Sequence, residues 1–398
     1  MKVSGMKYNV IFLGLVSFFA DLSTEMVYPL IPLYLTTVFG ATPALVGVIE
    51  GVAESLSSIL KVFSGYITDK YRKKKPLAFI GYAAGLVYKV ALVIVASWQG
   101  ILAARVIDRF GKGVRTTPRD VLVSESCDSD KLGHSFGIHK ALDMAGSAAG
   151  ILIAYFIMMT WKGEYGYKQL FMLSCIPAIA SLALFIFIKE TGDPCNVREP
   201  LHVSQGIKNL DKRLKLYLAV VFVFTLGNSS NVFLLLKAGN AGFDPASIVL
   251  LYFVYNVVSS VFAVPFGKRS DRIGRKRLLV LGYLTFSLAY AGFAWAPNKT
   301  MIVAAFALYG IFTAMTAGVE RAFVSEIAPK ELKGTMLGLH STIVGIALLP
   351  ASITAGILWN IFGSVIPFAF GASLSLVSAL MLAFGLPQKA GKGNISVQ

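Results

Sequence analysis

RVIDRFGKGVRTTPRD, residues 105 to 120, is the stretch that decides how this chain folds. Its five bases, Arg105, Arg109, Lys112, Arg115 and Arg119, recur every three or four residues, so they share one face of a helix. The other face is apolar. Because a charged residue in a membrane span costs about 2.5–3.5 kcal/mol on insertion scales, the stretch predicts a membrane helix whose basic stripe faces internal partners or a watery path.

The composition places the whole chain in a membrane. It is 56% hydrophobic and 15% charged, with a mean hydropathy of +0.68, whereas soluble domains are about 25% charged. Apolar runs long enough to span a bilayer lie near residues 8–38, 43–67, 77–97, 135–160, 168–188, 214–238, 246–267, 278–296, 300–320, 335–359 and 364–386. With the basic stretch at 99–125, they predict an all-α polytopic membrane protein with twelve transmembrane helices.

The distribution of bases predicts the topology. With both termini cytoplasmic, only Lys162, Lys168, Lys237 and Lys299 fall on the far side of the membrane, and the other bases lie on the cytoplasmic side or within spans. The net charge of +16 is therefore explained by a multi-pass protein of the cell inner membrane. A lipid bilayer is the expected environment, and a nucleic-acid partner is not expected.

The two halves of the chain repeat each other. LVSE at 122–125 recurs as FVSE at 323–326, and GIH at 137–139 recurs as GLH at 338–340, both 201 residues later. The polar interval at 189–213 separates the copies. We therefore predict a bundle of six helices over 1–188, a cytoplasmic linker over 189–213 and a second, pseudo-symmetric bundle over 214–398, arranged around a central cavity.

Several function classes are disfavoured. Cys127, Cys175 and Cys195 form no disulfide framework or metal-binding spacing, and the four histidines include no His-x-x-x-His pair. A Walker motif and a nucleophile–base–acid set are also missing from the sequence. We expect no enzyme activity, no cofactor and no metal, and a monomer. A sensor or scaffold is disfavoured because no loop could hold a soluble domain.

The loop between the eighth and ninth spans carries a family signature. It reads Gly267-x-x-x-Asp271-Arg272-x-Gly274-Arg275, and a first-half copy has arginine at position 72 where glycine is usual. On these residues the chain resembles the major facilitator superfamily. The resemblance implies that the acid caps a neighbouring helix and the bases hold the halves together on the cytoplasmic side. The implied gating residues are Gly65, Asp69, Lys70 and Arg72, together with Gly267, Asp271, Arg272, Gly274 and Arg275.

A second signature lies in the fifth span. Gly137, Gly146 and Gly150 resemble the motif of drug-efflux antiporters in this family, although Ile151 and Ala154 replace the expected proline and final glycine. Close helix packing by small residues explains the same spacing. Arg105 occupies the place of the family's fourth-helix arginine.

Carboxylates in the spans are candidates for proton coupling. Asp21 and Glu25 are one turn apart in the first span, Glu50 and Glu54 are one turn apart in the second, and Asp143 lies in the fifth. A buried carboxylate can take up and release a proton near neutral pH. The alternative is an ion-pair network that only neutralises the bases. His139 and His340 are interpreted as helix-end hydrogen bonders.

The substrate is predicted from the stripe. Arginine suits bidentate binding of carboxylate or phosphate, which favours an anionic or zwitterionic small molecule. The predicted binding residues are Tyr28, Arg105, Arg109, Lys112 and Arg115, with Asn228, Asn231, Tyr255 and Asn256 from the second half. We therefore predict a proton-coupled secondary transporter of a small organic solute, with efflux by antiport favoured. The alternative is uptake of an anionic metabolite, or of a metal chelate such as a siderophore, by symport.

Overall fold

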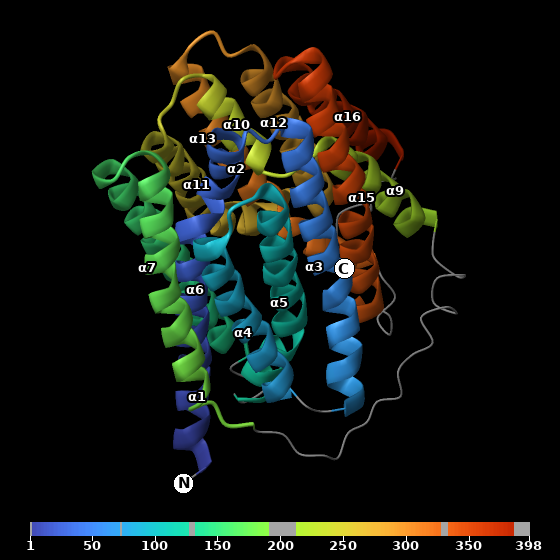
Figure 1. Cartoon of the computed structure of the whole chain (residues 1–398). Helices are drawn as coiled ribbons and strands as arrows, with labels where there is room; N and C mark the ends of the chain where they lie inside the picture. Colours follow the sequence, from blue (N-terminus) through green and yellow to red (C-terminus); the bar gives the residue numbers. More distant parts are fainter. Residues whose placement is uncertain (1, 72–73, 127–131, 191–211, 328–332, 386–398) are drawn as a thin grey trace, which may run out of the picture. The chain divides into compact units, whose positions relative to one another are not determined.

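The structure is a computed structural model that describes residues 2–71, 74–126, 132–190, 212–327 and 333–385. Every regular element among these residues is a helix (Figure 1). In the first half these are α1 (Lys2–Val27), η1 (Tyr28–Leu30), α2 (Ile31–Phe39), α3 (Pro43–Tyr71), α4 (Lys74–Ile94), α5 (Trp98–Glu125), α6 (Leu132–Thr160) and α7 (Gly163–Phe185). In the second half they are α9 (Lys212–Gly227), α10 (Val232–Asn240), α11 (Pro245–Ile273), α12 (Arg275–Trp295), α13 (Lys299–Thr316), α14 (Val319–Ile327), α15 (Lys333–Phe362) and α16 (Val365–Gly385).

Eleven spans in the described residues are long and apolar enough to cross a membrane. The basic helix α5 is not among them because of its charges, yet it packs against both α3 and α4. It is therefore the twelfth membrane helix, as its periodicity predicts. The chain is an all-α polytopic membrane protein.

The helices group into two compact units. Unit 1 comprises Met1–Pro200, Ser230–Phe253 and Ser352–Asn360, and unit 2 comprises Leu201–Ser229, Val254–Ala351 and Ile361–Gln398. Unit 1 thus includes α10, the start of α11 and part of α15 in addition to α1–α7. The predicted linker falls largely outside the described residues, so the domain boundaries remain a prediction.

The sequence repeat is visible in the helices themselves. Helix α12 (Arg275–Trp295) begins and ends 201 positions after α4 (Lys74–Ile94). Helix α11 (Pro245–Ile273) follows α3 (Pro43–Tyr71) by 202 positions at both ends. The counterpart of α5 differs, because residues 317 and 318 divide it into α13 and α14, whereas α5 is continuous through Pro118.

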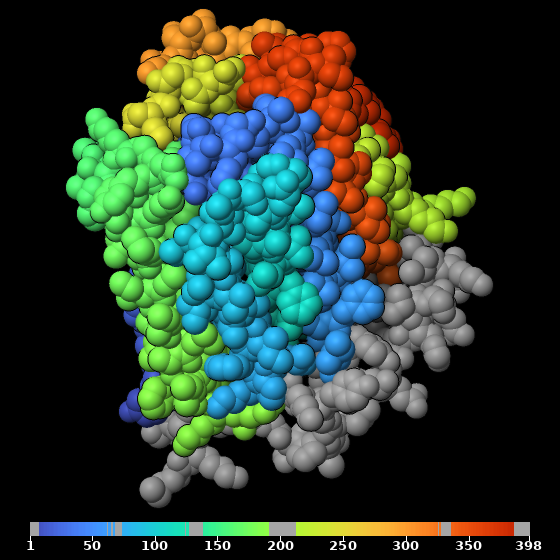
Figure 2. Space-filling view, in the orientation of Figure 1, coloured from blue at the N-terminus to red at the C-terminus, as the bar shows by residue number. Residues whose placement is uncertain are grey.

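The cores of the two units differ in character. In unit 1, a cluster of buried apolar side chains joins α1, α4, α5 and α7, including Leu13, Tyr82, Leu122 and Phe185. In the space-filling view, α4 (cyan) covers part of α5 (teal) (Figure 2). In unit 2, the core contains stacked rings from α9, α12, α13 and α16, such as Phe224 on Tyr283 and Phe286 on Tyr290. Among the described residues, the buried Asp, Glu, Lys and Arg side chains, such as Glu50, Lys89 and Arg105, all belong to unit 1.

Candidate functional site

The break in the first membrane span brings an aromatic ring to the basic stripe. Helix α1 ends at Val27, and a 3-10 turn that contains Pro29 begins at Tyr28. The guanidinium carbons of Arg105 and Arg109 lie 5.3 and 5.5 Å from the centre of the Tyr28 ring, within cation–π range. The centre of the Tyr252 ring, also in unit 1, lies 5.9 Å from the centre of the Tyr28 ring.

Arg105 is bound by a carboxylate from α3. Its Nε and Nη2 atoms donate to Glu50 Oε1 and Oε2 at 2.9 and 2.6 Å, and each side chain is only 1% exposed. A bidentate, fully buried pair of this kind leaves little of the guanidinium available to another anion. Arg105 is thus occupied by the protein itself.

Arg109 forms the second pair of the cluster. Its Nη2 lies 2.8 Å from Glu54 Oε1, and Asp108 Oδ2 lies 3.5 Å from Arg105 Nη1 and 3.7 Å from Arg109 Nε. The Glu54 side chain is 29% exposed, in contrast to the buried Glu50. The Arg109–Glu54 pair is therefore the one that an incoming solute could reach.

A lysine that was not among the predicted site residues completes this cluster. Lys89 on α4 is buried, with Nζ 3.4 Å from Thr24 Oγ1 and 4.1 Å from the Tyr88 ring centre, and it interacts electrostatically with Asp108. A lone base in an apolar run is itself a signal of function. Three cations, Lys89, Arg105 and Arg109, thus face the three carboxylates of Glu50, Glu54 and Asp108. This part of the stripe is electrically balanced.

The remaining bases of the stripe have different surroundings. The Arg115 guanidinium lies 4.6 Å from the Tyr82 ring centre, and Arg119 donates to Asp120 at 2.9 and 3.0 Å. Lys112 is exposed, and its ammonium makes no hydrogen bond or ion pair with the described residues. It is nevertheless close enough to act electrostatically on Asp21, Glu25 and Glu54. Lys112 is therefore the cation of the stripe that is open to a solute.

Two carboxyl groups meet where α1 packs on α6. Asp21 and Asp143 are in side-chain contact at hydrogen-bonding range. Asp143 Oδ2 accepts from Lys140 Nζ at 3.1 Å, but its Oδ1 is buried and receives no hydrogen bond from the described residues. Only a protonated carboxyl can donate to another carboxylate. A proton on Asp21 would give Asp143 Oδ1 its missing donor.

Glu25 lies one turn beyond Asp21 on α1. It is in hydrogen-bonding contact with Tyr252, while its Oε2 is buried with no hydrogen-bond partner in the described part of the chain. The structure therefore separates the five predicted coupling acids. Glu50 and Glu54 are tied to arginines, whereas Asp21 contacts Asp143, and Lys112 acts electrostatically on Asp21 and Glu25.

The predicted packing glycines lie on α6. A Cβ at Gly146 or Gly150 would overlap the carbonyl oxygens of Phe18 and Leu22 on α1, so these positions allow α1 and α6 to approach closely. Gly137 also lies in α6, but its surroundings are not described. His139, one turn before Asp143, lies with Nε2 3.0 Å from Ser17 Oγ, in agreement with a hydrogen-bonding role.

The predicted uncharged residues divide between the units. Asn231 lies in unit 1, at the start of α10, and the other three belong to unit 2. Asn228 Oδ1 accepts from the Tyr309 hydroxyl at 3.4 Å, and the Tyr255 ring lies 5.3 Å from the Tyr309 ring. Asn256 follows on α11 and is partly buried. Asn228 and Tyr255 therefore both contact the side chain of Tyr309.

The second-half signature adopts a defined geometry. Gly274, with φ of +93°, separates α11 from α12, a backbone conformation that favours glycine. Arg275 lies 3.3 Å from Asp271 and 3.1 Å from Glu326, and also donates to the Ala322 carbonyl at 3.1 Å. Asp271 is mostly exposed and pairs with Arg275, and α12 receives no side-chain cap. Arg275 thus ties α12 to α14.

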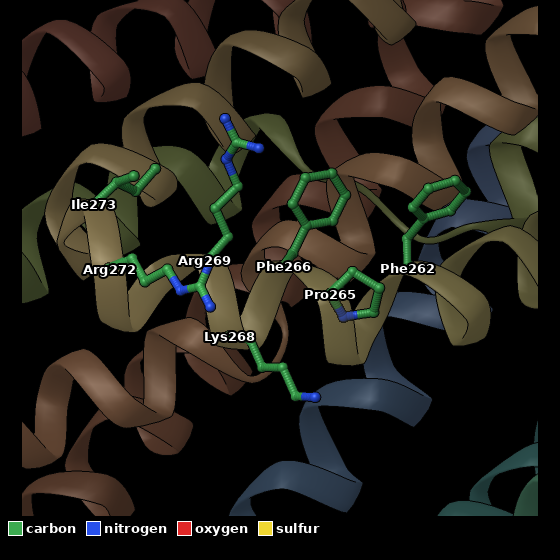
Figure 3. Close-up of a pocket in the computed structure, with 7 residues that line it drawn as sticks. All are labelled: Phe262, Pro265, Phe266, Lys268, Arg269, Arg272 and Ile273. Carbon is green, nitrogen blue, oxygen red and sulfur yellow. The ribbon is translucent and has the colours of Figure 1, made fainter.

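Three bases within this signature lie along α11. Figure 3 shows Arg272 with Lys268 and Arg269 around a surface pocket of about 490 Å³ that also contains the rings of Phe262 and Phe266. Gly267 lies on the same helix with open space around it. In the first copy, Gly65, Asp69 and Lys70 lie in α3, but their side chains are not described, and Arg72 is outside the described residues.

The described ranges contain no group of three or more His, Cys, Asp or Glu side chains that could hold a metal ion.

Comparison with known proteins gives a consistent result. The family model of the Major Facilitator Superfamily matches residues 13–236 and 216–398. An uncharacterized MFS-type transporter of Methanocaldococcus jannaschii is 37% identical over 94% of both chains. Multidrug resistance protein MdtH of Klebsiella pneumoniae is 20% identical over 79% of this chain and 77% of its own. The crystal structure of a D-xylose-proton symporter superposes with a TM-score of 0.77 at 17% identity, covering 95% of this chain and 97% of the symporter.

Proposed function

The chain belongs to the major facilitator superfamily, and from that premise we propose that it is a proton-coupled transporter of a small anionic or zwitterionic organic solute. Because the family and the relatives matched across the chain are transporters, the chain is a secondary transporter and not an enzyme. Our proposal goes beyond this family assignment in two respects, the coupling to protons and the charge of the substrate.

One observation carries the proposal: the Asp143 side chain is in contact with the Asp21 carboxyl, and its buried Oδ1 has no donor in the described residues. Two carboxylates in contact repel each other unless they share a proton. Glu50 is unsuited to this role because Arg105 binds both of its oxygens. The proton carrier that we assign is therefore the Asp21–Asp143 pair, with Glu25 as its neighbour.

The substrate class follows from Lys112 and Glu25. The exposed ammonium of Lys112 offers an ion-pair partner to a carboxylate or phosphate group. Glu25, whose Oε2 is unsatisfied, could accept a hydrogen bond from an amine or hydroxyl group of the same solute. Arg109 contributes through its accessible pair with Glu54. Arg105 acts in this proposal by holding Glu50 and positioning Tyr28.

The favoured direction is efflux by antiport. It is supported by the glycine spacing of α6, where Gly146 and Gly150 contact α1 beside the acid pair. A carboxyl that exchanges its proton for a solute at one site fits such a cycle. The alternative is symport uptake, for which the fold of the D-xylose-proton symporter is a precedent. We further propose an inner-membrane location with both termini cytoplasmic, on the distribution of bases.

The substrate is tested first by a binding screen on the purified full-length protein. Small carboxylates, phosphates, amino acids and lipophilic cations are compared for their effect on the thermal unfolding midpoint. We expect the anionic or zwitterionic compounds to stabilise the protein, and K112Q to lose this effect while it keeps the unfolding midpoint of the free protein. A lipophilic cation as the best ligand, or unchanged binding in K112Q, would overturn the substrate assignment.

Coupling is tested in proteoliposomes with a compound identified in that screen. Counterflow exchange requires only binding and alternation, whereas accumulation driven by a pH gradient also requires proton transfer. In D21N and D143N we expect exchange to persist and pH-driven accumulation to be lost. The partly exposed Asp120, which pairs with Arg119, provides D120N as a matched control. Accumulation that survives in both D21N and D143N rules out this pair as the carrier.

A further inference from the structure

The repeat places a charge of opposite sign at the same position in each unit. Glu320 on α14 lies 201 positions after Arg119 on α5. The surrounding residues are conserved in type across the repeat, since Tyr283 follows Tyr82 and His340 follows His139 by the same number. A cation and an anion thus occupy equivalent places, each beside a tyrosine and a histidine.

In unit 1 this position is fully hydrogen-bonded. Ser17 Oγ lies 3.0 Å from His139 Nε2 and 3.2 Å from the Tyr82 hydroxyl, and it accepts from Arg119 Nη1 at 3.3 Å. The imidazole therefore has a neutral partner, and the nearby guanidinium disfavours a second positive charge on the ring. Nothing in this arrangement requires an added proton.

In unit 2 the hydroxyl is missing, because Leu218 takes the place of Ser17. His340 Nε2 is buried and makes no hydrogen bond with the described residues. It faces Glu320 Oε2 across 3.9 Å, while the Tyr283 hydroxyl donates to Glu320 Oε1 at 3.3 Å. His340 is only 7% exposed. The imidazole Nε2 and a carboxylate oxygen thus face each other without a hydrogen bond between them.

The titratable and charged groups around this pair are few. Tyr217 on α9 stacks on the His340 ring at 6.2 Å, Tyr283 belongs to α12, and Arg321 follows Glu320 on α14 and acts on the imidazole. Among the described residues, Glu320 interacts with the phenols of Tyr217 and Tyr283, with Arg321 and with His340. No second carboxylate is among them.

We propose that Glu320 and His340 form a proton-binding site in unit 2, separate from the Asp21–Asp143 pair of unit 1. One proton from solvent bonds to the imidazole Nε2 or to the carboxylate, and the resulting N–H or O–H donates to the other group. The charge of the pair changes from −1 to 0, and no other reactant is needed. Because Glu320 lies in the first turn of α14, directly after the break at 317–318, the proton alters the charge at the start of that helix.

The test follows the imidazole directly. The full-length protein is labelled with isotopic histidine, reconstituted in lipid vesicles and titrated by solid-state NMR. The chain has only four histidines, so H340N assigns the signal of interest. In E320Q the carboxylate partner is lost. We therefore expect the midpoint of the His340 titration to move to lower pH by about one unit or more, which is a loss of proton affinity of about tenfold or more.

Two further variants make the result specific. Y283F removes the hydroxyl that stabilises the carboxylate of Glu320, so the transition should move the opposite way, to higher pH. H139N changes the equivalent histidine of unit 1 and should leave the His340 signal where it is. An unchanged transition in both E320Q and Y283F, or a His340 ring that never takes up a proton, would overturn the proposal. Because no substrate is present, this outcome is independent of the transport assays above.

Discussion

At the scale of the residue, the arginines of α5 show how far a charge pattern can be interpreted. The period of three and four residues correctly predicts that Arg105 and Arg109 share a face. It cannot predict which carboxylate each would meet, because that depends on how α3 packs on α5. The structure pairs Arg105 with Glu50 and Arg109 with Glu54. These two arginines form the ion-pair network that was one of the two predicted roles of the stripe, and the exposed Lys112 is the base that we propose for binding an anion.

The Arg105–Glu50 pair gives a stability prediction. Changing Glu50 to Gln leaves a buried guanidinium without its carboxylate, which we expect to lower the free energy of unfolding by about 3–5 kcal/mol. The double variant E50Q/R105Q removes both charges and should recover much of that loss. Thermal unfolding of the purified variants in detergent measures this. If the double variant is no more stable than E50Q, the two side chains are not energetically coupled.

Asp244 gives a prediction of pH dependence. It precedes α11 and accepts from the Ser247 amide at 3.1 Å and from its hydroxyl at 2.6 Å, and the hydroxyl hydrogen bond lowers the pKa of Asp244 below its ordinary value of 3.8. Because the pKa of Asp244 is lowered in the folded state, its ionised carboxylate stabilises the protein at pH values above the ordinary pKa. This contribution is lost as the pH falls through the lowered pKa.

The matching variants separate the cap from its charge. D244A should cost about 0.5–2 kcal/mol at neutral pH because α11 loses its N-cap. D244N keeps a capping oxygen, so it should stay close to wild type at neutral pH and show a weaker loss of stability below about pH 4. Unfolding curves at several pH values give the comparison. Equal acid sensitivity in D244N and wild type would contradict the assignment.

At the scale of the element, hydropathy and prolines predict most of the helices. The span at 99–125 is observed as α5 (Trp98–Glu125), where the Ser97 side chain accepts from the Gly100 amide at the start. The first span is interrupted at Tyr28, directly before Pro29. The division of the tenth span into α13 and α14 was not predicted. Gly318, at that break, was the available signal, but a glycine inside an apolar run does not by itself end a helix.

The contact of α1 with α6 gives a prediction for the element pair. Adding one methyl group at Gly146 forces it against the Phe18 carbonyl, so G146A should destabilise the protein by about 1–3 kcal/mol. Gly338 on α15 has open space around it, and G338A should be neutral or stabilising by up to about 1 kcal/mol. Unfolding midpoints measured side by side test this. Equal effects of the two substitutions would show that helical propensity, and not the packing of α1 against α6, determines the change in stability.

At the scale of the whole molecule, the repeat is the feature that sequence predicts best. Helix pairs such as α4 and α12 match end to end because each copy must bury the same faces. The difference between the copies is less predictable. Lys89 is a single charge in an apolar run, and Glu320 lies beside Arg321 at the end of one. Neither was among the predicted site residues, because the role of each depends on neighbours from other helices.

The topology prediction concerns the whole chain. Cys195, which lies outside the described residues, belongs to the interval predicted to be cytoplasmic. In inside-out vesicles a membrane-impermeant thiol reagent should label it, and in intact cells it should remain unlabelled. C195S provides the background from Cys127 and Cys175. Labelling of Cys195 from outside intact cells would reverse the orientation.

The charges of α5 also have a consequence for how the chain is made. This helix is not one of the eleven that are apolar enough to cross a membrane by themselves, yet its partners Glu50 and Glu54 lie on α3, which leaves the ribosome before it. The insertion machinery therefore meets α5 when its counter-ions are already in the bilayer. The order of the helices along the chain compensates for a span that could not enter lipid alone, and a rearranged gene that translated α5 before α3 would lose that advantage.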